Sequence, residues 1–359
     1  MLPAQVLVVD DSAVVRKLVT TALAGHPEIN VVGTASNGLI ALARIPQLNP
    51  DVVTLDINMP EMDGLQALVE IRRLYPRLPV IMFSVLTETG AAATIQALAA
   101  GASDYLTKPN SSESLTASMQ QIEQELTAKI LSLTGRETTG AASPIPPARL
   151  RERRWPGLHP VEVLAIGCST GGPTALSEVL SHLPANLPVP VVIVQHMPPL
   201  FTRFLAERLS AESPLKVCEA EQGQKLSAGE AYIAPGDYHM TVGRKGVERH
   251  IELNQELPEN SCRPAVDVLF RSVASTYGAG VLAAVLTGMG SDGARGAAHI
   301  REHGGEVIVQ DKETSVVWGM PGAVIEAGVA DTICPLSELG PEIMRRVQAG
   351  RMRSAAVGM

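Results

Sequence analysis

The chain has 359 residues and a formal net charge of −8, and 45% of its residues are hydrophobic, 18% charged and 3% aromatic. This length suits two domains of ordinary size, and Lys and Arg are spread along the chain without the basic stripe typical of nucleic-acid-binding proteins. No uninterrupted apolar run reaches the roughly 18–20 residues that span a bilayer, so we expect no direct membrane insertion.

Short β-branched runs alternate with helix-compatible stretches through residue 134. The expected strands are Val6–Asp10, Ile29–Ala35, Val52–Asp56, Val80–Ser84 and Asp104–Thr107. The expected helices include Ala13–Ala24, Leu65–Leu74, Ala91–Ala100 and the region 111–134. This alternation predicts a flavodoxin-like (βα)5 domain, in which helices cover both faces of a parallel sheet. Ligands of such sheets bind beyond the carboxyl ends of the strands.

The apolar periodicity disappears between about 135 and 159, where Gly, Pro, Ser, Thr and Arg dominate. This composition is typical of a linker. We therefore expect a first domain at residues 3–127, a helix end and flexible linker at 128–159, and a second domain at 160–350.

The alternation of expected strands and helices resumes after the linker. The expected strands are Val161–Gly167, Val189–Gln195, Leu215–Cys218, Ala231–Ala234, Val281–Thr287, Glu306–Gln310 and Ala330–Cys334. The expected helices include Thr174–Ser181, Phe201–Leu209, Ala265–Thr276 and Ala294–Glu302. The stretch His239–Leu253 alternates around a glycine-containing turn, which indicates a β-hairpin. The second half is thus predicted to be a doubly wound, mostly parallel α/β hydrolase-like (Rossmann-like) domain with a β-hairpin.

Carboxylates follow two of the strands expected in the first half. Asp10 and Asp11 end the first strand and Asp56 ends the third, so all three are expected at one edge of the sheet. Clustered carboxylates repel one another unless a cation joins them, and oxygen-only ligands suit Mg²⁺. Lys108, after the last strand, could neutralise a phosphoryl group transferred to a carboxylate. The alternative, that these residues only cap strands, does not explain why they occur together.

The segments VLVVDDSAVVRKLV, VVTLDINMPEMDGL, VIMFS and DYLTKP resemble the response-regulator receiver family over about residues 3–127. The resemblance implies that Asp56 is the phospho-acceptor and that Mg²⁺ is needed for its phosphorylation. It also implies that Asp11, Asp56 and the backbone carbonyl of Asn58 bind Mg²⁺, with Asp10 assisting through water. Ser84 and Tyr105 match the switch pair of the family, and Lys108 matches the residue that contacts the phosphate.

A glycine-rich turn follows the first strand expected in the second half. It reads Gly167-Cys168-Ser169-Thr170-Gly171, which matches the G-x-S-x-G pattern of a nucleophilic serine. The lysine of a Walker loop and the G-x-G-x-x-G spacing of a dinucleotide loop are both absent from this turn. The pentapeptide alone is weak evidence, because glycine-rich turns between a strand and a helix are common.

A nucleophilic serine needs a base, and the base needs an orienting acid. His196 ends an apolar strand and Asp292 follows another, which places both at the sheet edge expected for Ser169. His239 is a weaker competitor for the base, and the order Ser, His, Asp differs from the Ser, Asp, His order of ordinary α/β hydrolases. The sequence therefore predicts a serine hydrolase of a different family, whose hydrolytic reaction uses no metal or other cofactor.

The segments AIGCSTGG, VQHMP, APG, CRPAVDVLF and LTGMGSDGA resemble the chemotaxis protein-glutamate methylesterase (CheB) family, from about residue 158 to 347. The resemblance implies that Ser169, His196 and Asp292 form the catalytic triad. The backbone amides of Thr170 and Met289 are its oxyanion candidates. Cys168 departs from the small apolar residue usual in the family. We still expect Ser169 to be the nucleophile, since neighbouring side chains point differently and a free cysteine often behaves as a small hydrophobe.

The resemblance also implies a biological role. It predicts hydrolysis of glutamyl γ-methyl esters on methyl-accepting chemoreceptors with release of methanol, deamidation of receptor glutamines, and phosphorylation by a chemotaxis histidine kinase of the CheA type. In the family the unphosphorylated receiver impedes the hydrolase. Four widely spaced cysteines without a C-x-x-C pair, and an N-terminus that becomes acidic too early for a signal peptide, favour a cytoplasmic protein.

Two other classes of function remain open on the sequence. A transcriptional regulator would join the receiver to a compact helix-turn-helix module, which a second half of about 200 residues in α/β rhythm does not favour. A scaffold with a degenerate hydrolase fold would signal through binding alone. The presence of Ser169, His196 and Asp292 argues against a scaffold, although the sequence does not show that the three side chains meet.

Overall fold

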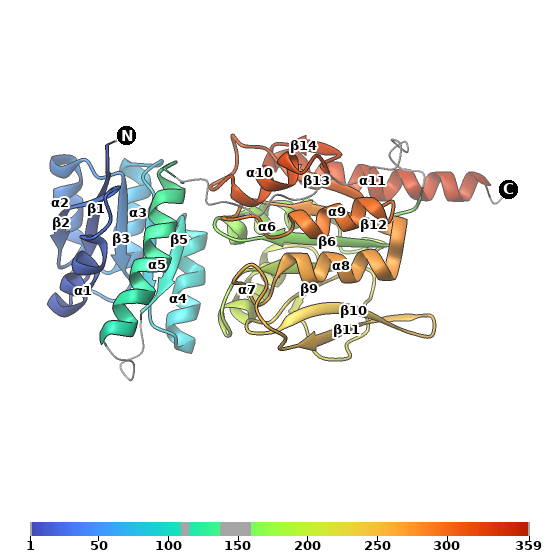
Figure 1. Cartoon of the computed structure of the whole chain (residues 1–359), viewed down its shortest axis with the longest axis horizontal. Coiled ribbons are helices and arrows are strands. Elements are labelled where there is room, and N and C mark those ends of the chain that lie inside the picture. Colours follow the sequence, from blue (N-terminus) through green and yellow to red (C-terminus); the bar gives the residue numbers. More distant parts are fainter. Residues whose placement is uncertain (1, 109–114, 137–158, 358–359) are drawn as a thin grey trace. The chain divides into compact units, whose positions relative to one another are not determined.

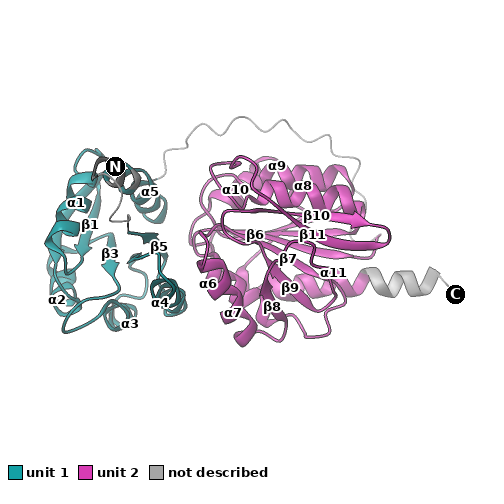
Figure 2. Ribbon diagram, turned by 90° about the horizontal axis from the view of Figure 1, so that it is seen from below, with its two compact units in different colours: residues 1–140 teal, residues 141–359 magenta. Residues whose placement is uncertain are grey.

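The computed structural model describes residues 2–108, 115–136 and 159–357, and the chain divides into two compact units, 1–140 and 141–359 (Figure 2). Most of the predicted linker, 137–158, lies outside the described residues. In the parts of the chain that are described, no helix is both long and apolar enough to cross a bilayer.

The first unit is a five-stranded parallel sheet in the order β2-β1-β3-β4-β5 (Figure 1). Its strands are β1 Ala4–Val9, β2 Ile29–Ala35, β3 Val52–Asp56, β4 Val80–Ser84 and β5 Asp104–Thr107. Its helices are α1 Ala13–Leu23, α2 Gly38–Leu48, α3 Gly64–Leu74, α4 Glu88–Ala99 and α5 Leu115–Leu133. Helix α5 buries Ile122, Leu126 and Ile130 at helical spacing against the same core cluster as Val6 and Phe83.

The second unit is a seven-stranded parallel sheet in the order β14-β13-β12-β6-β7-β9-β8, with a separate antiparallel hairpin of β10 and β11. The strands are β6 Val163–Cys168, β7 Val191–Gln195, β8 Lys216–Glu219, β9 Glu230–Ile233, β10 His239–Lys245, β11 Glu248–Asn254, β12 Val281–Val285, β13 Glu306–Gln310 and β14 Thr332–Cys334. The helices are α6 Gly172–Ser181, α7 Phe201–Glu212, α8 Val266–Tyr277, the 3-10 turn η1 Gly278–Gly280, α9 Ala294–Glu302, α10 Gly319–Glu326 and α11 Leu336–Val357.

The central strands of the second sheet are almost entirely buried. Every residue of β6, β7 and β12 is buried, as expected for a parallel sheet covered on both faces. The strand order places β6 between β7 and β12. Loops that leave the carboxyl ends of these three strands therefore start next to one another, which is the usual location of a ligand site in such sheets.

The fold class predicted from the sequence is confirmed, and several element boundaries agree to the residue. The bounds of β2, β3, β4, β5 and β13 are those expected. The hairpin is confirmed, and its two-residue turn falls at Gly246 and Val247, two residues later than the centre of the glycine-containing stretch Gly243–Gly246. Helices α2, α10 and α11 are not among the expected helices, and each contains a proline that lowers the helical signal, namely Pro46, Pro321 or Pro341.

Candidate active site

Three carboxylates gather at the carboxyl edge of the first sheet. Oxygen atoms of Asp10, Asp11 and Asp56 all lie within 4.8 Å of one another. The Lys108 Nζ atom lies 2.8 Å from Asp10 Oδ2 and 2.9 Å from Asp56 Oδ2. Burial raises the pKa of Asp56 and the Asp10 charge adds to this, while Lys108 opposes both. The set of donors is oxygen only, which is the chemistry that Mg²⁺ prefers.

The start of α3 packs directly on the end of β3. A Cβ atom at Gly64 would lie 2.0 Å from the Asp56 carbonyl oxygen, so only glycine permits this approach. The Gly64 N–H donates to the Ile57 carbonyl at 2.8 Å. A capping box between Asp63 and Gln66 fixes the first turn of the helix. These contacts hold the backbone that carries Asp56, so the carboxylate projects from a rigid strand end.

The structure also describes the surroundings of Ser84, Tyr105 and Asn58, whose roles stay predictions. The buried Ser84 hydroxyl donates to the Gly90 carbonyl at 3.0 Å. The buried Tyr105 ring lies 5.7 Å from the Lys129 Nζ atom, and burial raises the pKa of its phenol. Asn58 follows β3 and is exposed.

Ser169 directly follows β6 in the second unit. Its N–H donates to the Thr287 carbonyl at 3.0 Å, and its own carbonyl accepts from Gln195 Nε2 at 2.9 Å. The Gln195 Oε1 atom also lies 3.1 Å from Cys168 Sγ. The serine backbone is therefore tied to the loop after β12 and to the end of β7, the two strands that flank it.

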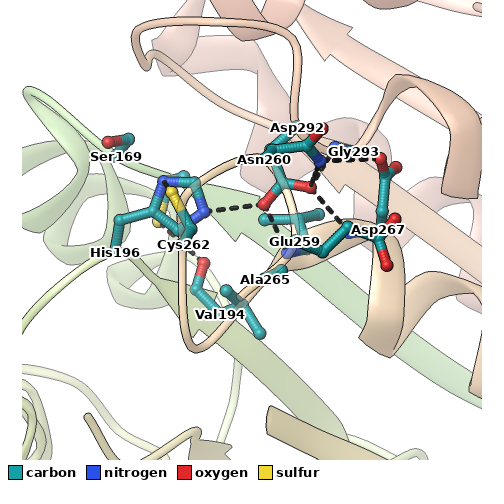
Figure 3. A network of polar contacts seen from close by, with 12 residues as sticks. Ser169, Val194, His196, Glu259, Asn260, Cys262, Ala265, Asp267, Asp292 and Gly293 are labelled. Carbon is teal, nitrogen blue, oxygen red and sulfur yellow. Dashed lines mark hydrogen bonds and ion pairs between the residues drawn. The ribbon is translucent and has the colours of Figure 1, made fainter. Parts of the chain in front are cut away.

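His196 and Asp292 meet beside this serine (Figure 3). The His196 Nε2 atom lies 2.8 Å from Asp292 Oδ2, and the side chains are 12% and 3% exposed. In Figure 3 the imidazole ring lies between Ser169 and Asp292. Among the described residues, no hydrogen bond joins the Ser169 hydroxyl to the ring. The structure thus brings the predicted base and acid into contact and places the predicted nucleophile at the same edge.

Asp292 is held by four hydrogen bonds besides the one from His196. Its Oδ2 atom accepts from Val266 N at 2.6 Å. Its Oδ1 atom accepts from Asp267 N at 3.0 Å, Gly293 N at 2.9 Å and Asn260 Nδ2 at 2.8 Å. Burial raises the pKa of Asp292, but His196 and the backbone N–H groups outweigh burial and lower it. The acid is therefore fixed in position and favoured in its ionised form.

The second ring nitrogen of His196 faces a cysteine. Its Nδ1 atom lies 3.6 Å from Cys262 Sγ. Burial lowers the pKa of His196, but contacts with Cys262 and Asp292 outweigh this and raise the pKa above its ordinary value. Because Asp292 accepts the Nε2 proton, Nδ1 is the nitrogen left to take a proton from a nucleophile.

The rival residues have structural partners. His239 is buried, with Nδ1 accepting from Ala265 N at 3.2 Å and Nε2 3.1 Å from the Leu257 carbonyl oxygen. The Cys168 thiol is fully buried, and burial raises its pKa far above the ordinary value. Both observations support Ser169 as nucleophile and His196 as base.

The loop after β12 lies close against the serine. A Cβ atom at Gly288 would lie 2.9 Å from Ser169 Cβ and 2.3 Å from Met320 Sδ, so glycine is required at this approach. The Ser169 N–H donates to the Thr287 carbonyl, and the oxyanion candidates implied by the resemblance are the amides of Thr170 and Met289. Their role stays a prediction.

Four residues of the site were missed by sequence reasoning: Gln195, Asn260, Cys262 and Asp267. Gln195 ends an apolar strand, and this position could have identified it. Asp267 and Cys262 fall within the segment CRPAVDVLF, but no spacing rule connects them to Asp292 or His196. Asn260 carries no local signal, because its contacts depend on a turn that joins distant elements.

The fold and the site define a protein with two parts, a receiver and an α/β domain that carries serine, histidine and aspartate at one sheet edge. Residues 6–120 match the response regulator receiver domain family, and residues 164–343 match the CheB methylesterase family. The chain belongs to the CheB family.

Relatives and a solved structure agree with this assignment. The chain is 53% identical to a protein-glutamate methylesterase/protein-glutamine glutaminase of Nocardioides sp., over 97% of this chain and 96% of the relative. It is 49% identical to a protein of the same description from Trichodesmium erythraeum, over 96% and 99%. The crystal structure of the Thermotoga maritima CheB methylesterase catalytic domain matches 52% of this chain and 98% of that domain, with 43% identity and a TM-score of 0.51.

Proposed function

We propose that the chain is a phosphorylation-activated protein-glutamate methylesterase and protein-glutamine glutaminase that acts on methyl-accepting chemoreceptors. The observation that carries this proposal is the 2.8 Å contact between His196 and Asp292 beside Ser169, in the loops that follow the two strands flanking β6. The family assignment supports the reaction class, because the relatives are described as methylesterases and glutaminases.

In the proposed reaction, Ser169 Oγ attacks the carbonyl carbon of a glutamyl γ-methyl ester. His196 takes the serine proton at Nδ1, and Asp292 holds the ring by accepting the Nε2 proton. The amides of Thr170 and Met289 stabilise the oxyanion. Methanol leaves, and water then hydrolyses the acyl-enzyme with His196 again as base. With a receptor glutamine, ammonia leaves in place of methanol and the product is the same glutamate.

Control of this reaction is proposed to come from Asp56. A chemotaxis histidine kinase of the CheA type would donate the phosphoryl group, and Asp10, Asp11, Asp56 and the Asn58 carbonyl would hold Mg²⁺. Bound Mg²⁺ would neutralise charge on the phosphoryl group during transfer. The 2.9 Å distance from the Lys108 Nζ atom to Asp56 Oδ2 supports a contact between Lys108 and the phosphoryl group. Ser84 and Tyr105 would then re-orient. The cytoplasm, where such kinases and receptor helices meet, is the proposed location.

The proposal is tested by measuring methanol release from methylated receptor membranes. We expect release by the whole protein, faster release with a small phosphodonor and Mg²⁺, and none above background from Ser169→Ala. A protein that binds the receptors but releases no methanol under any condition would instead be a scaffold.

A further inference from the structure

A four-residue turn, Glu259–Cys262, lies against the His196–Asp292 pair (Figure 3). Its ends are joined by two backbone hydrogen bonds, Cys262 N to Glu259 O at 2.9 Å and Glu259 N to Cys262 O at 3.1 Å. Asn260 and Ser261 have φ angles of 53° and 62°, as in a type I′ turn. Arg271 of α8 anchors the turn, with its terminal nitrogens 2.7 and 2.6 Å from the Glu259 carboxylate.

The Asn260 side chain bridges two carboxylates. Its Nδ2 atom lies 2.8 Å from Asp292 Oδ1 and 3.0 Å from Asp267 Oδ2, and an amide nitrogen has one hydrogen for each. The Asn260 Oδ1 atom accepts from Arg295 Nη2 at 3.0 Å. This third contact fixes which way the amide points, because the oxygen is engaged by a cation and the nitrogen faces the two acids.

The two acids need such a bridge. Asp267 and Asp292 are 0% and 2% exposed, and two buried like charges raise the cost of ionising both. Burial and the Asp292 charge raise the pKa of Asp267 to about 6, whereas the pKa of Asp292 is lowered. The pair is thus polarised in the direction that catalysis requires, since only an ionised Asp292 can stabilise the imidazolium of His196.

We propose that Asn260 is a positioning residue for the methylesterase reaction. By donating to both carboxylates it orients Asp292 toward His196 and keeps Asp292 ionised beside the buried Asp267. The inference depends on the proposed function, because it assigns Asn260 a role only through the triad acid.

The charged and titratable groups around this acid pair come from the end of β7, the turn, α8 and α9. They are His196, Glu259, Cys262, Asp267, Arg271 and Arg295. Removal of the Asn260 amide takes a donor away from Asp292 and leaves the two carboxylates to repel one another. The His196–Asp292 pair then takes up a proton more readily, so the acid limb of the kcat/KM profile moves to higher pH.

The test uses four variants of the whole chain, assayed for methanol release with saturating phosphodonor. Asn260→Gly removes the amide at a position where glycine adopts the positive φ without strain. Ser261→Gly is the matched control, because it changes the other positive-φ residue of the turn and leaves the bridge intact. Asn260→Gly/Asp267→Asn removes the second carboxylate together with the bridge. Ser169→Ala sets the background of the assay.

We expect Asn260→Gly to lower kcat about tenfold with little change in KM, since a displaced catalytic group affects the chemical step. Its acid limb should move to higher pH, and NMR titration of His196 in the enzyme without substrate should move the same way. The double variant should shift the limb back, and Ser261→Gly should resemble the unmodified protein.

An unchanged kcat in Asn260→Gly would overturn the inference. An equal loss of kcat in Ser261→Gly would also overturn it. So would a lower kcat in Asn260→Gly whose acid limb stays in place and is not altered by adding Asp267→Asn, because Asn260 would then only support the turn. In each of these cases Ser169→Ala remains inactive and the proposed function stands. Activity of Ser169→Ala above background would overturn the proposed function, and the inference with it.

Discussion

Buried negative charge is balanced by different kinds of donor at the two sheet edges of this protein. At the receiver edge, the Lys108 ammonium group is shared between Asp10 and Asp56. At the hydrolase edge, Asp292 is surrounded by fixed donors, three backbone N–H groups and the Asn260 amide, in addition to His196. Both sites lie beyond the carboxyl ends of parallel strands, so the difference lies in the donors and not in the fold.

The two arrangements of donors suit two different functions, switching in the receiver and catalysis in the hydrolase. A carboxylate balanced by a lysine side chain can change partners when a phosphoryl group or a cation arrives, as a switch requires. A carboxylate held by backbone groups keeps its position and charge through each turnover, which is the preorganisation that lowers a reaction barrier. The comparison predicts that the two sites can be disabled separately.

The largest expected effect is at the nucleophile. Ser169→Ala should lower methanol release roughly 10⁴-fold or more, to the assay background, because a serine triad fails without its nucleophile. Cys168→Ala is the matched control, since its thiol is buried against Gln195, and it should retain most of the activity. The reverse pattern would make Cys168 the nucleophile.

The second-largest loss of activity is expected from a change at Asp292, the proposed triad acid. Asp292→Asn should lower kcat roughly 10³- to 10⁴-fold, because the neutral amide cannot stabilise the imidazolium and disturbs the ring orientation. The measurement is the methylesterase rate under saturating substrate, with circular dichroism as the check on folding. A loss below tenfold would mean that the fixed donors around Asp292 serve stability more than catalysis.

A substitution at Asp56 of the receiver should affect only the activation of the methylesterase by a phosphodonor. Asp56→Asn should abolish the rate increase produced by a phosphodonor and leave the unstimulated methylesterase rate, since the triad is untouched. Rates with and without phosphodonor check this outcome. If the variant loses its unstimulated activity although it is folded, the two sites are not separable in the way that the comparison requires.

The pH dependence of the methylesterase rate is a further property expected to come from the second unit alone. His196 must be neutral to accept the serine proton, and its pKa is raised because Cys262 and Asp292 outweigh the lowering caused by burial. The rate should therefore fall as pH decreases through a value above 6.5, the ordinary histidine pKa. Cys262→Ala should move this limb to lower pH. A rate that is constant down to pH 6 would contradict the raised pKa.

The smallest effect concerns the metal. Mg²⁺ at about ten times its Kd should stabilise the receiver by about 1.4 kcal/mol, a shift of a few degrees in Tm. Asp11→Asn should reduce the shift, whereas a change in the second unit such as Ser261→Gly should leave it. Calorimetry with and without Mg²⁺ measures it. An equal shift in all three proteins would place the cation elsewhere.

Much of the fold could be predicted because both units follow a regular pattern. Strands such as β3 and β7 are short apolar runs bounded by loop residues, and their ends determine where Asp56 and His196 lie. The gathering of Ser169, His196 and Asp292 at one sheet edge could be predicted for the same reason, since each follows an apolar strand, while their catalytic roles stay a proposal. The 2.8 Å contact between His196 and Asp292 agrees with that expectation.

The rest of the site depends on contacts between distant segments. Asn260 reaches Asp292 only because a turn with two positive φ angles is pinned to α8 by Arg271, and neither feature has a periodic signal. The Cys262 contact with His196 spans 66 positions. Helix α10 was missed because Pro321 stands near its start, where a proline is tolerated without being a helix signal.

The most direct test of the central claim, a receiver that controls a serine methylesterase, is methanol release by three proteins with and without a small phosphodonor. The unmodified chain should release methanol slowly alone and faster with phosphodonor. Asp56→Asn should stay at the slow rate in both conditions, and Ser169→Ala should stay at background in both. Activation that persists in Asp56→Asn, or methanol release by Ser169→Ala, would contradict the account.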